Sequence, residues 1–304
     1  MEDYELTLYD RISVIKLTNE KYDLEHNAYL SFSGGRDSTI LHHLLDEALP
    51  NNTIPRVFID TGIEYTMIRE FVLKMAENDK RFVIIKPSKP IKKTLEEFGY
   101  PFKSKQHSHN VAIYQRNHKI TRSLEVYLGK SLTKKGKDTI FHCPELLRYQ
   151  FTDDFKIKVS DLCCMKMKKE PVHKWEKENN RHIAITGMRK EEGGNRLQLT
   201  CIITDSKGKI QKFHPFAVVS DEFEEWYRER ERIELAPLYY PPFNFKRTGC
   251  KGCPFTLELQ EQLELLERYL PNERKQCEII WQPIYAEYRR LNYRLKNIEK
   301  VKLF

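Results

Sequence analysis

The stretch Ala28–Leu45, AYLSFSGGRDSTILHHLL, contains the transition that decides the fold. Its first five residues, Ala28–Phe32, form a short apolar run that is typical of a buried strand. A glycine-containing turn follows at Ser33–Ser38, and from Thr39 onward apolar side chains recur at helical spacing. The stretch therefore predicts a strand, a tight turn and a helix that packs on a sheet.

The turn has the composition of a phosphate-binding loop. Gly34 and Gly35 carry no Cβ, so the backbone can approach an anion closely. The first amides of the following helix are unpaired and carry the positive end of its dipole. Ser33 and Ser38 add hydroxyl donors, and Asp37 can cap the helix or hold Mg²⁺. No Gly-Lys-Ser/Thr follows, which excludes the Walker pattern; the alternative is a tight turn without a ligand.

Further strands and helices alternate along the chain. The sequence predicts an N-terminal helix over Tyr4–His26, strands over Arg56–Ile59, Phe82–Ile85 and His182–Ile185, and helices over Met67–Met75 and Ile91–Phe98. Such alternation favours a doubly wound, mainly parallel α/β sheet of Rossmann-like type. Two helices, Leu257–Leu270 and Glu273–Leu295, are predicted to form a C-terminal helical segment.

Several polar residues follow the predicted strands. In an open parallel sheet the ligand crevice lies at the carboxyl ends of the strands, where Ser31, Asp60, Thr61 and Gly187 are found. We therefore expect them to face the same pocket as the glycine turn. For Asp60 and Glu64 the alternative is helix capping.

The rest of the chain divides less clearly. The segment 100–157 is rich in Lys, Arg, His and Ser and is predicted to be a basic insertion, with no convincing metal spacing among His107, His109 and His118. A helix over Val159–Asn179 is predicted to begin with Ser160 as its N-cap. A hairpin is expected over residues 199–213, and a charged helix over Asp221–Glu231. The predicted domains are residues 1–235, an α/β nucleotide-binding domain with the insertion, and 236–304.

Charge and composition narrow the functional class. The chain has 304 residues and a net charge of +8, which suits a polyanionic partner such as a nucleotide or nucleic acid, although a solvated surface explains it equally well. No apolar run approaches the length of a membrane span, and the N-terminus is acidic rather than signal-like. We expect a cytoplasmic protein with no membrane association, whose seven cysteines are reduced.

Four of these cysteines form two close pairs. Cys163 and Cys164 are adjacent, and Cys250 and Cys253 form a Cys-x-x-Cys. Thiolates are soft donors, so the candidates are an iron–sulfur cluster or zinc. Adjacent cysteines reach one ion with difficulty but can bind separate iron corners, which favours a 4Fe–4S cluster. Zinc and unrelated buried thiols are the alternatives. The other three are expected to be ordinary small apolar residues: Cys143, Cys201 and Cys277.

The combined motifs resemble the phosphoadenosine phosphosulfate reductase family, within the adenine nucleotide alpha hydrolase-like superfamily. The Ser-Gly-Gly-Arg-Asp-Ser turn resembles the PP-loop of ATP pyrophosphatases. The strand end at Asp60, the tandem cysteines, the segment from Thr186 to Arg196 and the stretch Arg247–Cys253 follow in family order over about residues 25 to 255. The resemblance implies a 4Fe–4S cluster on the four cysteines, as in adenylylsulfate-type members. It also implies that Arg189 and Arg196 bind the anionic group of the substrate.

Two departures argue against sulfate reduction. The family's reductases carry a nucleophilic cysteine in a C-terminal Glu-Cys-Gly motif, which this sequence lacks; Cys277 lies in a predicted helix and does not match it. The reductases also have a degraded phosphate loop, whereas this loop is intact, as in the branch that hydrolyses ATP.

These features lead to one hypothesis and two rivals. The hypothesis is an ATP pyrophosphatase that adenylylates a substrate for sulfur transfer, with Asp37, Arg189 and Arg196 as catalytic residues and Mg²⁺ on Asp37 and Asp60. Its nucleotide-binding residues would be Ser31, Ser33, Gly34, Gly35, Arg36, Asp37, Ser38, Asp60, Thr61 and Gly187. The expected partners are an adenine nucleotide, tRNA or DNA, a sulfur-donor or other partner protein, and a second copy in a homo-oligomer. The rivals are a sulfonucleotide reductase that uses an external thiol or Cys277, and a nucleotide-sensing cluster subunit of a defence or DNA-modification complex.

Overall fold

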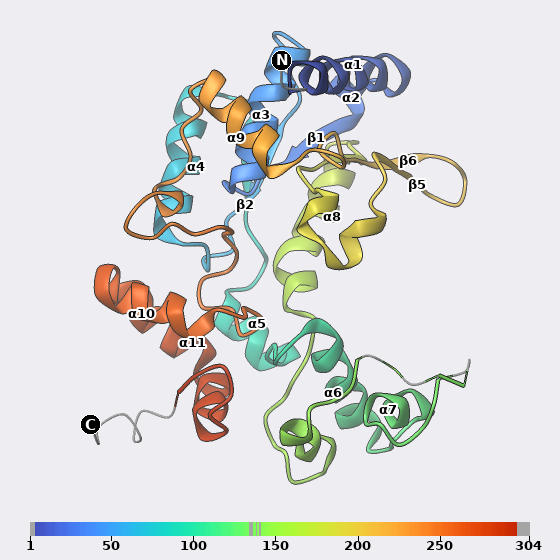
Figure 1. The fold of residues 1–304 in the computed structure, drawn as a ribbon, viewed down its shortest axis with the longest axis vertical. Coiled ribbons are helices and arrows are strands. Elements are labelled where there is room, and N and C mark those ends of the chain that lie inside the picture. Colours follow the sequence, from blue (N-terminus) through green and yellow to red (C-terminus); the bar gives the residue numbers. More distant parts are fainter. Residues whose placement is uncertain (1–3, 134–135, 138, 140, 297–304) are drawn as a thin grey trace. The chain divides into compact units, whose positions relative to one another are not determined.

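A computed structural model describes residues 4–133, 136–137, 139 and 141–296 (Figure 1). The chain forms two compact units: unit 1 comprises Met1–Pro87 and Glu170–Thr248, and unit 2 comprises Ser88–Lys169 and Gly249–Phe304. This division differs from the predicted boundary at residue 235. The basic segment folds together with the C-terminal helices, because residues far apart in the sequence share one core in unit 2.

Unit 1 contains a six-stranded sheet in the order β3-β2-β1-β4-β6-β5. Its strands are β1 (Ala28–Ser31), β2 (Arg56–Ile59), β3 (Phe82–Ile85), β4 (Ile183–Ile185), β5 (Ile202–Thr204) and β6 (Ile210–Phe213). All neighbouring pairs are parallel except β5 with β6, which form the predicted antiparallel hairpin. The sheet confirms the expected mainly parallel α/β fold.

Helices cover both faces of this sheet. On one face, Trp175 packs against Tyr29 at 5.4 Å between ring centroids and joins Val57 and Ala184 in a buried cluster. Leu30 points to the opposite face, because successive strand residues alternate. The helices of unit 1 are α1 (Tyr4–Tyr22), α2 (Leu24–Asn27), α3 (Arg36–Ala48), α4 (Thr66–Asn78), α8 (Glu170–Glu178) and α9 (Asp221–Arg230), with short turns η3 (Lys190–Glu192), η4 (Gly194–Gln198) and η5 (Pro237–Tyr239).

Unit 2 is helical in its described residues. Its elements are α5 (Ile91–Phe98), α6 (Lys105–Asn117), α7 (Arg122–Tyr127), η1 (Glu145–Phe151), η2 (Met165–Lys169), α10 (Leu259–Tyr269) and α11 (Pro271–Arg290). His107 is fully buried in its core and contacts Tyr127 Oη at 2.9 Å and Gln150 Oε1 at 2.7 Å. This histidine therefore has a structural role in the core of unit 2.

The helix predicted over Val159–Asn179 is wrong at its start. Val159 instead pairs with Tyr100 in an isolated bridge, and Ser160 Oγ accepts a hydrogen bond from the amide of Leu162 at 2.9 Å, two residues on. A local turn thus uses the hydroxyl that was expected to cap a helix. Helical structure begins at Cys163 and passes through the π-helical turn η2.

The described helices include none that is long and apolar enough to cross a membrane.

Candidate nucleotide site and cysteine cluster

The turn between β1 and α3 has the geometry of an anion-binding loop. Gly35 is the N-cap of α3 in an extended conformation, with no side chain capping the helix. The amide of Gly35 donates to Ser33 Oγ at 3.2 Å, and the amide of Arg36 donates to the hydroxyl of Tyr239 at 2.9 Å. Hydroxyl oxygens thus occupy the positions that phosphate oxygens take at helix N-termini.

Two glycines of the loop are needed for different reasons. Gly34 has φ +70°, and a Cβ there would lie 2.7 Å from Val72 Cγ2 and 2.9 Å from Ile68 Cγ2 of α4. Gly35 has φ −81°, which any residue adopts. A Cβ at Gly35 would lie 3.1 Å from Ser33 Oγ and 3.2 Å from Tyr239 Oη. Gly34 therefore fits the loop to α4, whereas Gly35 keeps the cavity side of the loop open.

A third glycine fits β4 against the loop. A Cβ at Gly187 would lie 2.9 Å from the carbonyl oxygen of Asp37. Any side chain there would displace the first turn of α3. The sequence prediction that Gly187 belongs to the site is consistent with this contact, although its role is close packing.

The loop opens into a cavity of 330 Å³. Its lining includes the predicted residues Ser31, Ser33, Gly35, Arg36, Asp37, Ser38, Gly187 and Arg196, together with Lys246, Arg247 and Thr248. Ser33 Oγ and Ser38 Oγ lie 3.0 Å apart, and the hydroxyls of Tyr239 and Thr248 lie 2.8 Å apart. A dense group of hydroxyls and cations at a helix N-terminus is suited to holding a polyphosphate.

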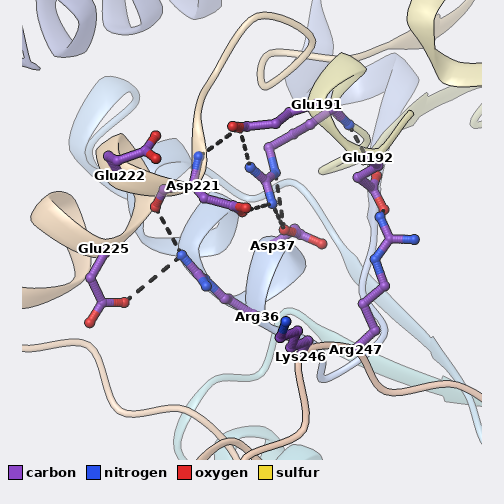
Figure 2. Close-up of a pocket in the computed structure, with 10 residues that line it drawn as sticks. Arg36, Asp37, Glu191, Glu192, Asp221, Glu222, Glu225, Lys246 and Arg247 are labelled. Carbon is purple, nitrogen blue, oxygen red and sulfur yellow. Dashed lines mark hydrogen bonds and ion pairs between the residues drawn. The ribbon is translucent and has the colours of Figure 1, made fainter. Parts of the chain in front are cut away.

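Arg189 lies in a second cavity of 680 Å³, shown in Figure 2. It is 5% exposed and is held by carboxylates on several sides: its Nη2 lies 2.6 Å from Asp221 Oδ1, and its Nε lies 3.2 Å from Asp37 Oδ1. Burial alone would lower the pKa of Arg189, but Glu224 and Asp221 raise it. With its donors directed at carboxylates, Arg189 orients Asp37 more readily than it binds a substrate anion.

Arg196 has the freer position of the two predicted arginines. Its side chain is 37% exposed, and it forms an ion pair with Glu192, which also pairs with Arg247. Burial, with Arg247 nearby, lowers the pKa of Arg196. Two cations share one carboxylate here, so the group keeps a surplus of positive charge at the cavity. Arg196 and Arg247 are therefore the better candidates for binding an anionic substrate group.

Asp60 and Thr61 are not among the residues that line these two cavities. Asp60 Oδ2 pairs with Arg69 Nε at 2.9 Å, and the amide and hydroxyl of Thr61 both donate to Glu64, at 2.9 and 2.6 Å. These contacts close the turn before α4. Glu64 thus binds Thr61 and does not cap α4, whose N-cap Tyr65 has no side-chain capping hydrogen bond.

A buried acid of α9 lies beside the loop. Glu224 is fully buried, 3.3 Å from Arg36 Nε and 3.4 Å from Arg189 Nη2. Burial, assisted by the Asp37 carboxylate, raises the pKa of Glu224 to about 9. Burial thus favours the protonated form of Glu224, against the two guanidinium groups beside it.

Sequence reasoning missed several residues of this site. Tyr239, Asp221 and Glu224 lie far along the chain from the loop, and no local pattern connects them with it. Thr248 and Lys246 flank Arg247 in the stretch before the Cys-x-x-Cys, so that motif is the one signal that pointed to this part of the chain.

The four paired cysteines all belong to unit 2 and lie close together. Burial raises the pKa of Cys163, and Cys250, Cys164 and Cys253 raise it further. Burial also raises the pKa of Cys253 to about 12, with Cys250 and Cys164 contributing. Such mutual effects act over short distances, so the structure brings two cysteine pairs that are separated by 85 residues of sequence into one region.

The four cysteines are chemically suited to bind a metal ion or cluster through their thiolates. Soft thiolates of this number suit an iron–sulfur cluster or zinc. Within the described residues, however, no group of three or more His, Cys, Asp or Glu has the arrangement of a metal site. The four thiols are thus near neighbours whose positions are not those of ligands around one ion.

Side chains of helix α11 donate hydrogen bonds to the backbone of the Cys-x-x-Cys loop. Trp281 Nε1 donates to the carbonyl of Lys251 at 3.0 Å, Tyr288 Oη donates to that of Pro254 at 2.9 Å, and Tyr285 donates to that of Gly252. Gly252 has φ +62°, and a Cβ there would lie 2.7 Å from Cys277 Sγ. Cys277 is fully buried beneath the loop, as expected for a small apolar residue.

Comparison with protein families decides the relationship. Residues 27–141 and 142–256 match the family of the phosphoadenosine phosphosulfate reductase domain. The chain belongs to this family. The matched residues of this PAPS reductase family member include both its phosphate loop and its four paired cysteines. No curated protein matches the sequence.

Solved structures with a related arrangement are distant in sequence. The phosphoadenylyl-sulfate (PAPS) reductase of Candida auris is 16% identical, with a TM-score of 0.44, 74% of this chain and 81% of that chain covered. The FMN adenylyltransferase of Candida glabrata in complex with ATP is 12% identical, with a TM-score of 0.44 and coverage of 79% and 61%. The NH3-dependent NAD synthetase of Campylobacter jejuni is 13% identical, with a TM-score of 0.41 and coverage of 95% and 96%.

Proposed function

We propose that this PAPS reductase family member is an ATP pyrophosphatase that forms AMP and pyrophosphate, and that it activates an acceptor for sulfur transfer. One observation supports the proposal: an intact Ser-Gly-Gly-Arg-Asp-Ser loop, whose Gly35 and Arg36 amides donate to hydroxyl oxygens, lines a cavity together with Arg196, Lys246 and Arg247. A substrate without β and γ phosphates does not need such a loop.

The loop residues have distinct roles in the proposed reaction. The amides of Gly35 and Arg36 and the hydroxyls of Ser33 and Ser38 bind the departing pyrophosphate, where preorganised donors stabilise developing charge. Asp37 provides a carboxylate for Mg²⁺, which typically takes one or two carboxylates together with phosphate oxygens. Arg189 keeps Asp37 in place through the 3.2 Å contact.

The chemistry proceeds in two displacements. An oxygen of the acceptor attacks the α-phosphorus, an O–P bond forms, and the bond between the α-phosphorus and the bridging oxygen breaks as pyrophosphate leaves. A sulfur nucleophile at the oxidation level of sulfide then attacks the activated carbon, and AMP leaves with the carbon–oxygen bonding electrons. Cys163, Cys164, Cys250 and Cys253 would hold a 4Fe–4S cluster, which supplies a place to bind sulfur when present.

The test uses the two loop glycines as a matched pair. Gly35→Ala should leave the melting temperature within a few degrees of the wild type, but weaken Mg·ATP binding at least about 10-fold, because its methyl group enters the hydroxyl cluster. Gly34→Ala should lower the melting temperature, because φ is +70° and α4 is in contact. Gly35→Val should abolish release of pyrophosphate.

Product analysis separates this proposal from its rival. Calorimetry should show ATP binding at least about 10-fold tighter than AMP, because the loop holds the outer phosphates. Equal affinities for the two nucleotides, or turnover that survives in Gly35→Val, would contradict the proposal. The family relationship keeps sulfonucleotide reduction as the second candidate, and sulfite released from adenylylsulfate by an added thiol would favour it.

The cofactor is tested by anaerobic purification with iron, sulfide and zinc assays. We expect iron and acid-labile sulfide in equal amounts. If the protein contains zinc but no sulfide, the four cysteines bind zinc and not a cluster. If it contains neither metal, both assignments are wrong.

A further inference from the structure

The surplus of positive over negative side chains in this protein lies in unit 2. Unit 1 contains 24 Lys and Arg against 28 Asp and Glu, whereas unit 2 contains 28 against 16. Most of the surplus lies in residues 88–169, with 18 Lys and Arg against 8 Asp and Glu. The unit with the phosphate loop is thus slightly acidic, and the charge that suits a large polyanion is carried elsewhere in the chain.

This basic segment contains a groove of its own. Its volume is 650 Å³, and its lining comes from the end of α5, the part of α6 from His109 onward with His118, and the stretch 152–162. The volume is in the range of specific ligand sites. All of its lining residues belong to unit 2, and none of them lines the two cavities around the phosphate loop.

Each of the two carboxylates that line the groove lies beside a histidine. Asp153 Oδ1 lies 2.9 Å from His118 Nδ1, and Asp161 Oδ1 lies 3.5 Å from His109 Nδ1. The remaining cations are Arg116, Lys156 and Lys158, all exposed, and among the described residues none of them has a carboxylate within ion-pair distance. The ammonium of Lys156 donates to the carbonyl of Asp153 at 2.7 Å, which fixes its position without neutralising it.

A partly exposed aromatic ring lies in the same groove. Phe98 ends α5, and Lys166 Nζ lies 4.6 Å from its ring centroid. Sites for single-stranded nucleic acid combine a positively charged groove with aromatic rings on which unpaired bases stack. An acidic protein partner would use the cations but has no need for the ring.

We infer that the groove lined by Phe98, Arg116, Lys156 and Lys158 binds a single strand of nucleic acid, with phosphates on the cations and a base on Phe98. The inference assigns a binding site to the nucleic acid. Only the identification of that nucleic acid as the acceptor of the reaction rests on the proposed function. Binding itself requires no ATP chemistry.

The experiment measures fluorescence anisotropy of labelled 20-nucleotide RNA and DNA strands and a 20-base-pair DNA duplex, with the full chain and without nucleotide. Arg116→Glu/Lys156→Glu should weaken single-strand binding at least about 10-fold and flatten the logarithmic salt dependence by about 1.4. The matched control, Arg268→Glu/Lys275→Glu, makes the same charge change at exposed positions of α10 and α11 and should change affinity less than 2-fold.

Three outcomes would overturn the inference: an equal loss in the control pair, duplex binding as tight as single-strand binding, or polyglutamate of equal charge competing as well as RNA. Phe98→Leu should weaken single-strand binding at least about 5-fold at unchanged salt dependence. A comparison of the affinities for the RNA and DNA strands shows which of the two nucleic acids is preferred. If the protein does not cleave ATP but these binding results are obtained, the proposed function is wrong and the inference about the groove stands. If the protein cleaves ATP but these binding results are not obtained, only the inference about the groove is wrong.

Discussion

Units 1 and 2 offer different kinds of groups to an anion. In unit 1 the site at the start of α3 consists of backbone amides and hydroxyls at fixed positions, with arginines that are themselves paired with carboxylates. In unit 2 the groove has exposed cations, and the other conspicuous feature is a group of four thiols. The net charge of the chain therefore does not indicate which unit carries the phosphate-loop sequence.

We expect the first region to be the more selective of the two, because its donors are few and directed. Amides of a helix N-terminus have fixed orientations, so they recognise the shape of a phosphate as well as its charge. The second region has longer and more mobile donors, which suit a repeating backbone. We therefore expect substitutions in one unit to leave the function of the other unchanged, and this expectation can be tested from both sides.

The largest effect should come from the cysteines. Cys253→Ser should lose nearly all bound iron, because a hydroxyl replaces a thiolate in a set whose four members lie close together. Iron and sulfide assays after anaerobic purification measure this. The affinity for Mg·ATP, which depends on unit 1, should stay within about 2-fold of the wild type.

Cys201→Ser is the control for this substitution, because Cys201 belongs to unit 1 and is half-buried. It should keep its iron. Iron retained in Cys253→Ser, or lost equally in Cys201→Ser, would contradict the assignment of the four paired cysteines.

The second effect concerns the loop that carries two of these cysteines. Gly252→Ala should destabilise unit 2 by about 2–4 kcal/mol, because φ is +62° and the added methyl group would overlap with Tyr285 and Cys277. Thermal unfolding measures the loss. Gly249→Ala is the matched control: it lies three residues earlier, and nothing lies within 4 Å of a Cβ there. Equal melting temperatures for the two variants would mean that α11 does not fix the loop.

Local sequence predicted much of unit 1 and the first helix of unit 2. The strands Arg56–Ile59 and Phe82–Ile85 and the helix Ile91–Phe98 have the predicted bounds, since apolar runs and periodicity are properties of short segments. The strand, turn and helix at Ala28–Leu45 follow the same rule. The helix expected from Val159 failed because Ser160 forms a turn with Leu162, and a serine suits either structure.

The candidate site was less predictable, because its side chains have partners that are distant in sequence. The hydroxyl of Tyr239 reaches the amide of Arg36 across 203 positions, and Arg189 meets Asp221 across 32. The sequence identified Arg189 but not the carboxylates around it, on Asp37, Asp221 and Glu224. For the same reason the division into two units could not be read from composition along the chain.

The smallest effect concerns Glu224, and it tests whether the wall behind the phosphate loop is neutral. Burial raises the pKa of Glu224 from its ordinary value of 4.5 to about 9 in the folded chain. Between these values the folded state keeps a proton that the unfolded state has released, so Glu224 makes stability fall as the pH rises from about 5 to 9. The slope from one such proton is at most about 1.4 kcal/mol per pH unit.

Glu224→Gln removes that proton while keeping the shape of the side chain. The variant should match the wild type near pH 5 and unfold a few degrees higher at pH 8, in thermal unfolding followed across that range. Glu222→Gln, an exposed position of the same helix, should leave the profile unchanged. If Glu224→Gln were instead less stable than the wild type at pH 8, Glu224 would be a charged partner of Arg36 and Arg189. The loop would then face a fixed negative charge, which opposes a polyphosphate, so the sign of this small difference bears directly on the site that unit 1 is proposed to contain.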